Sequence, residues 1–182
     1  VDAGLIRAHK RPPVEREGEE AIDYGFVGDI DSVEADILRK QLDNGLMPVV
    51  SPLSCDESGV LLNINADTVA AAIAAELNAE KLILVTGATG ILEDIDDPSS
   101  LISYIDRTHL QQLKDDGVLA DGMLPKAAAI NAAIKIGVLR VLFISYKLPD
   151  SILLEVFNNE GNGTIVVDDI AALSPEEQGD ES

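Results

Sequence analysis

The amino-acid sequence predicts an α/β fold, in the form of a three-layer αβα sandwich around an open and mostly parallel sheet. Apolar runs of strand length alternate with segments of helical periodicity along most of the 182 residues, which is the pattern of strand–helix–strand units. Residues 81–86 are apolar almost throughout, as expected of a strand that is covered on both faces. Turn signals rich in Gly, Pro and Asp separate these segments.

Short extended segments surround one helix in the first third of the chain. A Pro- and charge-rich loop or hairpin is expected within residues 11–25. The helix that follows is predicted to begin at Asp31, whose side chain would cap it, and to end at the Asn-Gly pair 44–45. The extended segments are expected at residues 1–11, 25–30, 47–51 and 60–65.

Strands and helices alternate through the rest of the chain. Residues 68–77 are rich in alanine and nearly free of polar side chains, which predicts a helix that is packed on several sides. The apolar run 81–86 is predicted to be a central parallel strand. Further helices are expected at 108–116, 123–136 and 151–158, and further strands at 138–145 and 163–167.

Composition limits the classes of partner. The chain carries 33 Asp and Glu against 13 Lys and Arg, a formal charge of −20, so nucleic acids and anionic membrane surfaces are excluded as partners of the whole chain. No apolar run approaches the roughly 20 residues of a membrane span. The single cysteine, Cys55, cannot form an internal disulfide, and a reducing cytoplasm is the simplest expectation. The acidic side chains indicate either an ordinary solvated surface or adaptation to high salt.

The stretch NINAD places Asn63, Asn65 and Asp67 at alternate positions, where an expected strand meets the alanine-rich helix. Alternation along an extended segment sends the three side chains to the same side. One of them could simply cap the helix. Because a helix needs one cap and three polar side chains are present, we also expect a polar cluster that faces a ligand.

A glycine-containing loop and a lysine give two further candidate sites. The loop 86–90 follows the apolar run, where ligands bind in parallel α/β sheets, but it matches neither common phosphate-loop motif, and a plain turn is the alternative. Lys126 follows Pro125 at an expected helix start, where a lysine is unfavourable unless an anion lies against it. A solvent-facing lysine is the alternative there. His9 and His109 are isolated, so no metal-ligand spacing is expected.

Lys126, Asp67 and the glycine loop together are typical of phosphoryl transfer, which depends on positioning and charge neutralisation. With these motifs the chain resembles the N-acetylglutamate kinases of the amino-acid kinase superfamily, from about Gly25 to Val166. The segments that carry the resemblance are GFVGDIDSV, MPVVSPL, NINADTVAAAIAAELNAEKLIL, GATGIL, DGMLPK and EVFNNEGNGTIV.

The resemblance implies an amino-acid kinase-like fold and ATP-dependent phosphorylation of the γ-carboxylate of N-acetylglutamate, a step of arginine biosynthesis. ATP with Mg²⁺ and N-acetylglutamate are the implied ligands, and the full-length protein is expected to be a homo-oligomer. Lys126 would stabilise the transferring phosphoryl group, and Asp67 would organise the catalytic lysines. Asn63 and Asn65 would bind the acylated amino acid. The implied nucleotide contacts are Gly87, Ala88, Thr89, Gly90, Ile91, Leu92, Val118, Leu119 and Ala120.

The resemblance also implies a division of the chain and several departures from the family. Residues 1–65 would end the substrate lobe, 66–173 would form the nucleotide-binding lobe, and 174–182 would be an acidic tail. The family's first glycine-rich loop, with a second catalytic lysine, has no counterpart, so the chain alone is expected to be inactive. Gly87 stands where the family usually has Asp, and Asp150 where the arginine-inhibited branch often has His.

Two other functions remain open at this point. One is a kinase of another acylated amino acid. The other is a non-catalytic kinase-like domain that senses arginine, although the presence of both Asp67 and Lys126 is an argument against it.

Overall fold

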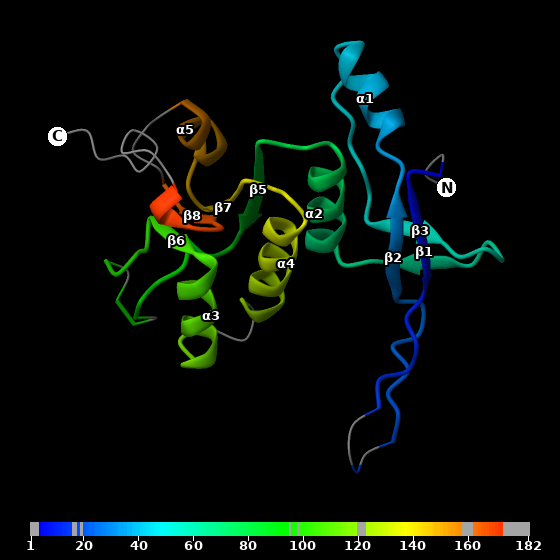
Figure 1. The fold of residues 1–182 in the computed structure, drawn as a ribbon, viewed down its shortest axis with the longest axis horizontal. Coiled ribbons are helices and arrows are strands. Elements are labelled where there is room, and N and C mark those ends of the chain that lie inside the picture. The colour runs from blue at the N-terminus through cyan, green and yellow to red at the C-terminus, as the bar shows by residue number, and fades with distance from the viewer. Residues whose placement is uncertain are drawn as a thin grey trace. The chain divides into compact units, whose positions relative to one another are not determined.

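A computed structural model of the chain describes residues 4–15, 18, 20–94, 96–97, 99–119, 123–157 and 162–172. These residues form two compact units, which are divided in the sequence between Leu77 and Asn78 (Figure 1). Each unit is described by itself. Within the described ranges, no helix is long and apolar enough to cross a membrane.

The first unit combines two small antiparallel sheets with two helices. Strands β1 and β2 pair with Ile6 opposite Val33, and strands β3 and β4 pair with Leu53 opposite Asn63. Between β1 and β2 the chain folds back as the expected hairpin, with a bridge between Val14 and Ile22. The elements are β1 (Ile6–Lys10), β2 (Gly28–Val33), α1 (Asp36–Asp43), β3 (Leu53–Cys55), β4 (Leu61–Asn63) and α2 (Ala66–Glu76).

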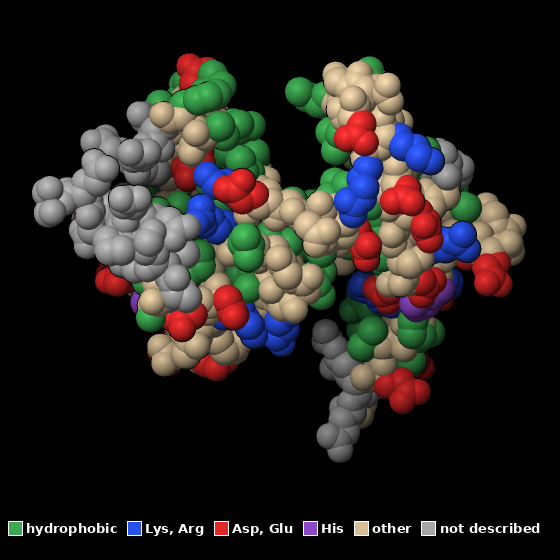
Figure 2. Space-filling view, turned by 45° about the horizontal axis from the view of Figure 1, so that its top comes forward, with side chains coloured by type: hydrophobic (Ala, Val, Ile, Leu, Met, Phe, Trp, Pro, Cys, Tyr) green, Lys and Arg blue, Asp and Glu red, His purple; other side chains and the backbone are tan. Residues whose placement is uncertain are grey.

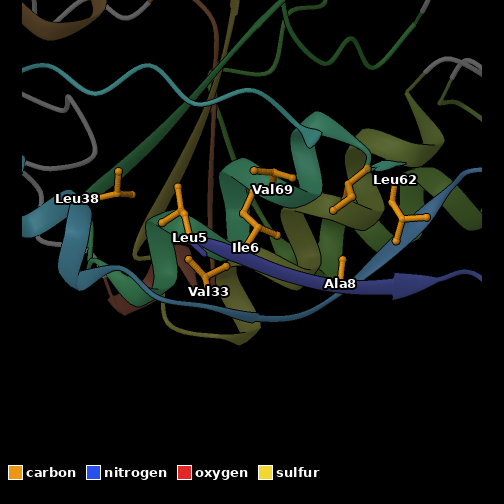
Figure 3. Packing of buried hydrophobic residues seen from close by; sticks show 8 residues of the cluster. Leu5, Ile6, Ala8, Val33, Leu38, Leu62 and Val69 are labelled. Carbon is orange, nitrogen blue, oxygen red and sulfur yellow. The ribbon is translucent and has the colours of Figure 1, made fainter. Parts of the chain in front are cut away.

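The core of this unit lies where the two small sheets and the helices pack together (Figure 3). Its buried side chains are Leu5, Ile6, Ala8, Val33, Leu38, Leu62, Ile64 and Val69. Gly28 allows this packing, because a Cβ at that position would lie 2.9 Å from the Leu62 Cβ. Since Leu62 and Ile64 point inward, the side chains of Asn63 and Asn65 are held at the exposed surface.

Two expectations for the first unit are wrong. Asp31 does not cap a helix: it lies inside β2, and its carboxylate contacts the ring Nδ1 of His9 on β1 at 2.7 Å. Pairing with β1 keeps residues 28–33 extended, and α1 begins only at Asp36. The expected strand at 47–51 is also not formed, and the side chains of Met47 and Val49 are almost fully exposed.

The second unit contains a four-stranded sheet in the order β5, β7, β8, β6 (Figure 1). The pairs β5–β7 and β6–β8 are parallel, whereas β7 and β8 are antiparallel. The expected mostly parallel sheet is therefore a mixed sheet, because β8 runs antiparallel to β7 after the connection through α5. The elements are β5 (Lys81–Thr86), β6 (Tyr104–Asp106), α3 (Arg107–Asp115), α4 (Leu124–Lys135), β7 (Arg140–Ser145), α5 (Ser151–Phe157), β8 (Thr164–Val167) and the 3₁₀ turn Ile170–Ala172.

Strand β7, and not β5, is the fully covered strand of this sheet. Residues 141–144 of β7 are at most 1% exposed, and both α4 and α5 contact the strand. Strand β5 was expected to be central, but among the described strands it pairs with β7 alone. Val85 on this edge strand is 47% exposed. The apolar character of residues 81–86 predicted the strand correctly and its place in the sheet wrongly.

Candidate functional site

The NINAD stretch is arranged around the start of α2. Asn65 caps the helix, since its side-chain Oδ1 accepts the backbone N–H of Thr68 at 3.1 Å. The helix begins at Ala66, so Asp67 lies in its first turn and not on an extended segment, and the expected alternation of three side chains ends at Asn65. The negative charge of Asp67 suits this position, because the N-terminus of a helix carries partial positive charge. Substrate and catalytic roles for Asn63, Asn65 and Asp67 stay predictions.

The glycine loop after β5 is held in one conformation by hydrogen bonds. The backbone N–H of Ala88 donates to the hydroxyl oxygen of Thr86 at 3.1 Å, and that hydroxyl donates to the carbonyl oxygen of Ala88. Further along, the N–H of Ile91 donates to the buried hydroxyl of Thr164 on β8 at 2.8 Å. A Cβ at Gly90 would lie 2.6 Å from the same hydroxyl oxygen, so only glycine fits there. The loop is thus anchored at both ends.

A small pocket of about 110 Å³ lies against this loop. Its wall brings together residues from the loop and from the segment that follows α3. The lining residues are Ala88, Gly90, Ile91, Leu92, Val118, Leu119 and Met123. Six of these seven are among the expected nucleotide contacts, and the apolar lining of the pocket suits a heterocyclic base. Ala120 lies outside the described residues, and contacts with a nucleotide stay predictions.

Met123 was missed as a pocket residue, although it stands in the DGMLPK motif. It occupies the N-cap position of α4, and its carbonyl oxygen accepts the N–H of Ala127 at 2.8 Å. Lys126 is partly buried in the first turn of the same helix, after Pro125. The pocket and Lys126 are therefore connected through one turn of α4. Asp121 and Gly122 of the motif lie outside the described residues.

A larger and more polar cavity of about 530 Å³ lies elsewhere in the second unit, between α3 and α4. Its walls contain none of the expected site residues. They are formed by Arg107, Thr108, Gln111, Gln112, Asp115, Asn131, Lys135 and Asp168. Two positive and two negative side chains line it, and Arg107 Nη1 binds Asp168 Oδ1 at 2.6 Å. Because six expected site residues line the smaller, apolar pocket and none lines this cavity, we assign the candidate site to the pocket.

Comparison with known proteins shows the family to which this sequence belongs. Residues 3–145 match the amino acid kinase family. The chain belongs to the amino acid kinase family. It is 45% identical over 173 residues to an acetylglutamate kinase of Myxococcus xanthus and 47% identical over 167 residues to one of Archaeoglobus fulgidus. These matches cover 91–92% of this amino acid kinase chain but only 56% and 58% of the two relatives, so the chain spans little more than half their length.

Solved structures show the same fold. An N-acetylglutamate synthase from Neisseria gonorrhoeae, complexed with coenzyme A and L-arginine, is 25% identical with a TM-score of 0.80, over 91% of this chain and 37% of the synthase chain. Carbamate kinase from Giardia lamblia, bound to AMP-PNP, is 19% identical with a TM-score of 0.60, over 87% of this chain and 52% of that one. Because the identity to the carbamate kinase is only 19%, that likeness concerns the fold alone.

Proposed function

We propose that this amino acid kinase chain is the nucleotide-binding part of an acetylglutamate kinase, which phosphorylates the γ-carboxylate of N-acetylglutamate with ATP in arginine biosynthesis. One observation carries the proposal: residues 88, 90–92 and 118–119, two segments that are distant in sequence, line one apolar pocket beside the start of α4. The 45–47% identity to acetylglutamate kinases supports the choice of substrate.

The site residues divide the chemistry between them. With the base in the pocket, the phosphates extend toward the first turn of α4, where Lys126 neutralises charge on the transferring phosphoryl group. Asp67 belongs to the other unit, and its proposed role is to hold the catalytic lysines in position. Among the described side chains, no three of His, Cys, Asp and Glu come together as metal ligands. In this proposal Mg²⁺ accompanies ATP, and phosphate oxygens and water would supply most of its ligands, as is usual for this ion at nucleotides.

The proposed activity belongs to a protein longer than this chain. The matched relatives have more than two-fifths of their own length outside the match. We expect the chain alone to bind nucleotide without turning over N-acetylglutamate. Assembly of the longer protein into a homo-oligomer is part of the same proposal, and analytical ultracentrifugation tests it.

Calorimetric titration of Mg-ADP into the chain tests the nucleotide site. We expect Lys126→Ala to weaken binding by about tenfold or more, since a charge-assisted contact to phosphate is lost. Lys135→Ala is the matched control, because it removes the same charge from the last turn of the same helix and should leave the affinity unchanged. No binding to the unsubstituted chain, or equal weakening by both substitutions, contradicts the proposal.

An arginine-sensing domain is the second candidate, favoured by the likeness to the synthase structure that is complexed with L-arginine. This function predicts that L-arginine binds to the chain and Mg-ADP does not. The reverse result, nucleotide binding without arginine binding, excludes it and retains the kinase.

A further inference from the structure

Gly87 and Tyr146 meet at the carboxyl ends of two parallel strands. Strands β5 and β7 end level with each other, with Thr86 opposite Ser145, so the next residue of each strand is at the same edge of the sheet. The backbone N–H of Tyr146 donates to the carbonyl oxygen of Thr86 at 2.9 Å, which continues the pairing by one step. Ligands bind at such strand ends in α/β sheets.

The phenol of Tyr146 lies in close contact with the position that a Cβ on residue 87 would take. A Cβ built on Gly87 would stand 3.2 Å from the Tyr146 hydroxyl oxygen, 3.4 Å from its Cε1 and 3.5 Å from its Cζ. The backbone φ of Gly87 is not in the left-handed region, so glycine is not required there by conformation. What glycine provides is the space that the tyrosine ring covers.

Tyr146 is exposed to solvent and is not part of the core, so its side chain is accessible to a ligand. Tyr146 is 67% exposed, although aromatic residues usually bury most of their surface. Gly87 opens the loop whose next residues, Ala88 and Gly90, line the apolar pocket. The phenol therefore lies against Gly87, one residue before the loop begins to line the pocket.

We propose that Tyr146 is a nucleotide-contact residue, whose hydroxyl donates a hydrogen bond to the phosphates of a nucleotide that has its base in the apolar pocket. This inference rests on the proposed nucleotide-binding function. A phenol is a neutral donor that needs no counter-charge, which suits a phosphate contact in a chain of formal charge −20. Gly87 contributes by leaving the phenol in place.

The test compares Mg-ADP with adenosine, which has no phosphate. Tyr146→Phe keeps the ring and removes only the hydroxyl. We expect it to weaken Mg-ADP binding about tenfold in calorimetry and to leave adenosine binding, followed by NMR titration, unchanged. Tyr24→Phe is the matched control, because Tyr24 is an exposed tyrosine of the first unit, which contributes nothing to the pocket.

A second readout does not depend on affinity differences. The chain has three tyrosines, Tyr24, Tyr104 and Tyr146, so their ring signals can be assigned by single substitutions to Phe. We expect Mg-ADP to shift the ring signals of Tyr146 and not those of Tyr24.

Gly87→Ala, which crowds the hydroxyl, should weaken Mg-ADP binding in the presence of Tyr146 and have no further effect in the Tyr146→Phe variant.

The outcomes separate this inference from the function on which it rests. If Tyr146→Phe binds Mg-ADP like the unsubstituted chain, or loses adenosine affinity equally, the phosphate contact is overturned and the nucleotide pocket stands. If the unsubstituted chain binds no Mg-ADP, the proposed function fails and the role of Tyr146 fails with it.

Discussion

The hydroxyl of Thr164 occupies the position that a side chain at Gly90 would need. A Cβ at position 90 would lie 2.6 Å from the Thr164 Oγ1, and the same oxygen accepts the N–H of Ile91. One buried hydroxyl on β8 therefore both fixes the loop after β5 and requires glycine within it. The wall of the candidate pocket depends on this contact.

Gly90→Ala should lower the free energy of unfolding by about 1–3 kcal/mol, because the added methyl group overpacks a buried site. It should also weaken Mg-ADP binding, since the loop must move. Urea denaturation measures the first effect and calorimetry the second. Thr89→Ala, at the exposed neighbouring position, is the control and should change stability by less than about 0.5 kcal/mol. Equal stability of both variants contradicts the steric argument.

Asn65→Ala should destabilise the chain by about 1 kcal/mol, because the N-cap of α2 is lost. Asn65→Asp keeps an oxygen acceptor and should restore most of the loss. Asn63→Ala, at an exposed position of β4, should have little effect on stability. Thermal unfolding followed by circular dichroism measures all three. A destabilisation by Asn63→Ala as large as that by Asn65→Ala would contradict the assignment of the cap.

Acid should remove a contribution to stability that comes from Asp29. Hydrogen bonds from the Arg11 guanidinium hold the pKa of the Asp29 carboxyl below its usual value. A carboxyl whose pKa is lower in the folded chain stabilises the fold above its unfolded pKa, and the contribution is lost as the pH falls toward the folded pKa. Stability should therefore decrease below about pH 4.

The Asp29→Asn variant isolates this pair. It should be less stable than the unsubstituted chain at neutral pH, and the difference should shrink as the pH falls below about 4. Urea midpoints measured across the pH range test this. A difference that is constant with pH would assign the effect of the substitution to packing and not to charge.

Salt should stabilise the chain. Acidic side chains are scattered over the visible surface of each unit and not gathered in one patch (Figure 2). At a formal charge of −20 their mutual repulsion opposes folding, and dissolved ions screen it. The melting temperature is therefore expected to rise from low to high KCl. A melting temperature that stays constant or falls would exclude adaptation to high salt.

The sequence alone predicted most elements, because hydrophobic periodicity reports which faces are covered. It did not predict which strands pair with each other. Residues 81–86 form the expected strand, but periodicity cannot tell an edge from a centre, and β5 lies at the edge. Asp31 has a good capping side chain, and pairing of β2 with β1 overrides that local preference.

The candidate site shows the same division. The polar stretch around Asn65 could be found from local spacing, and the cap that the structure shows was one of its two interpretations. The loop at 86–90 was a candidate from its place after an apolar run, whereas the nucleotide contacts predicted at 91–92 and 118–120 came from the resemblance, since no local pattern connects them. The meeting of Gly87 with Tyr146 depends on the register of β5 and β7, and neither residue carries a signal of it.

The edge position of β5 has a consequence for association with other polypeptides. An apolar strand with one unpaired side accepts a further strand from another polypeptide, through backbone hydrogen bonds and with little demand on sequence. Among the described strands β5 pairs with β7 alone, so its other edge is a surface to which a strand of another polypeptide can be added.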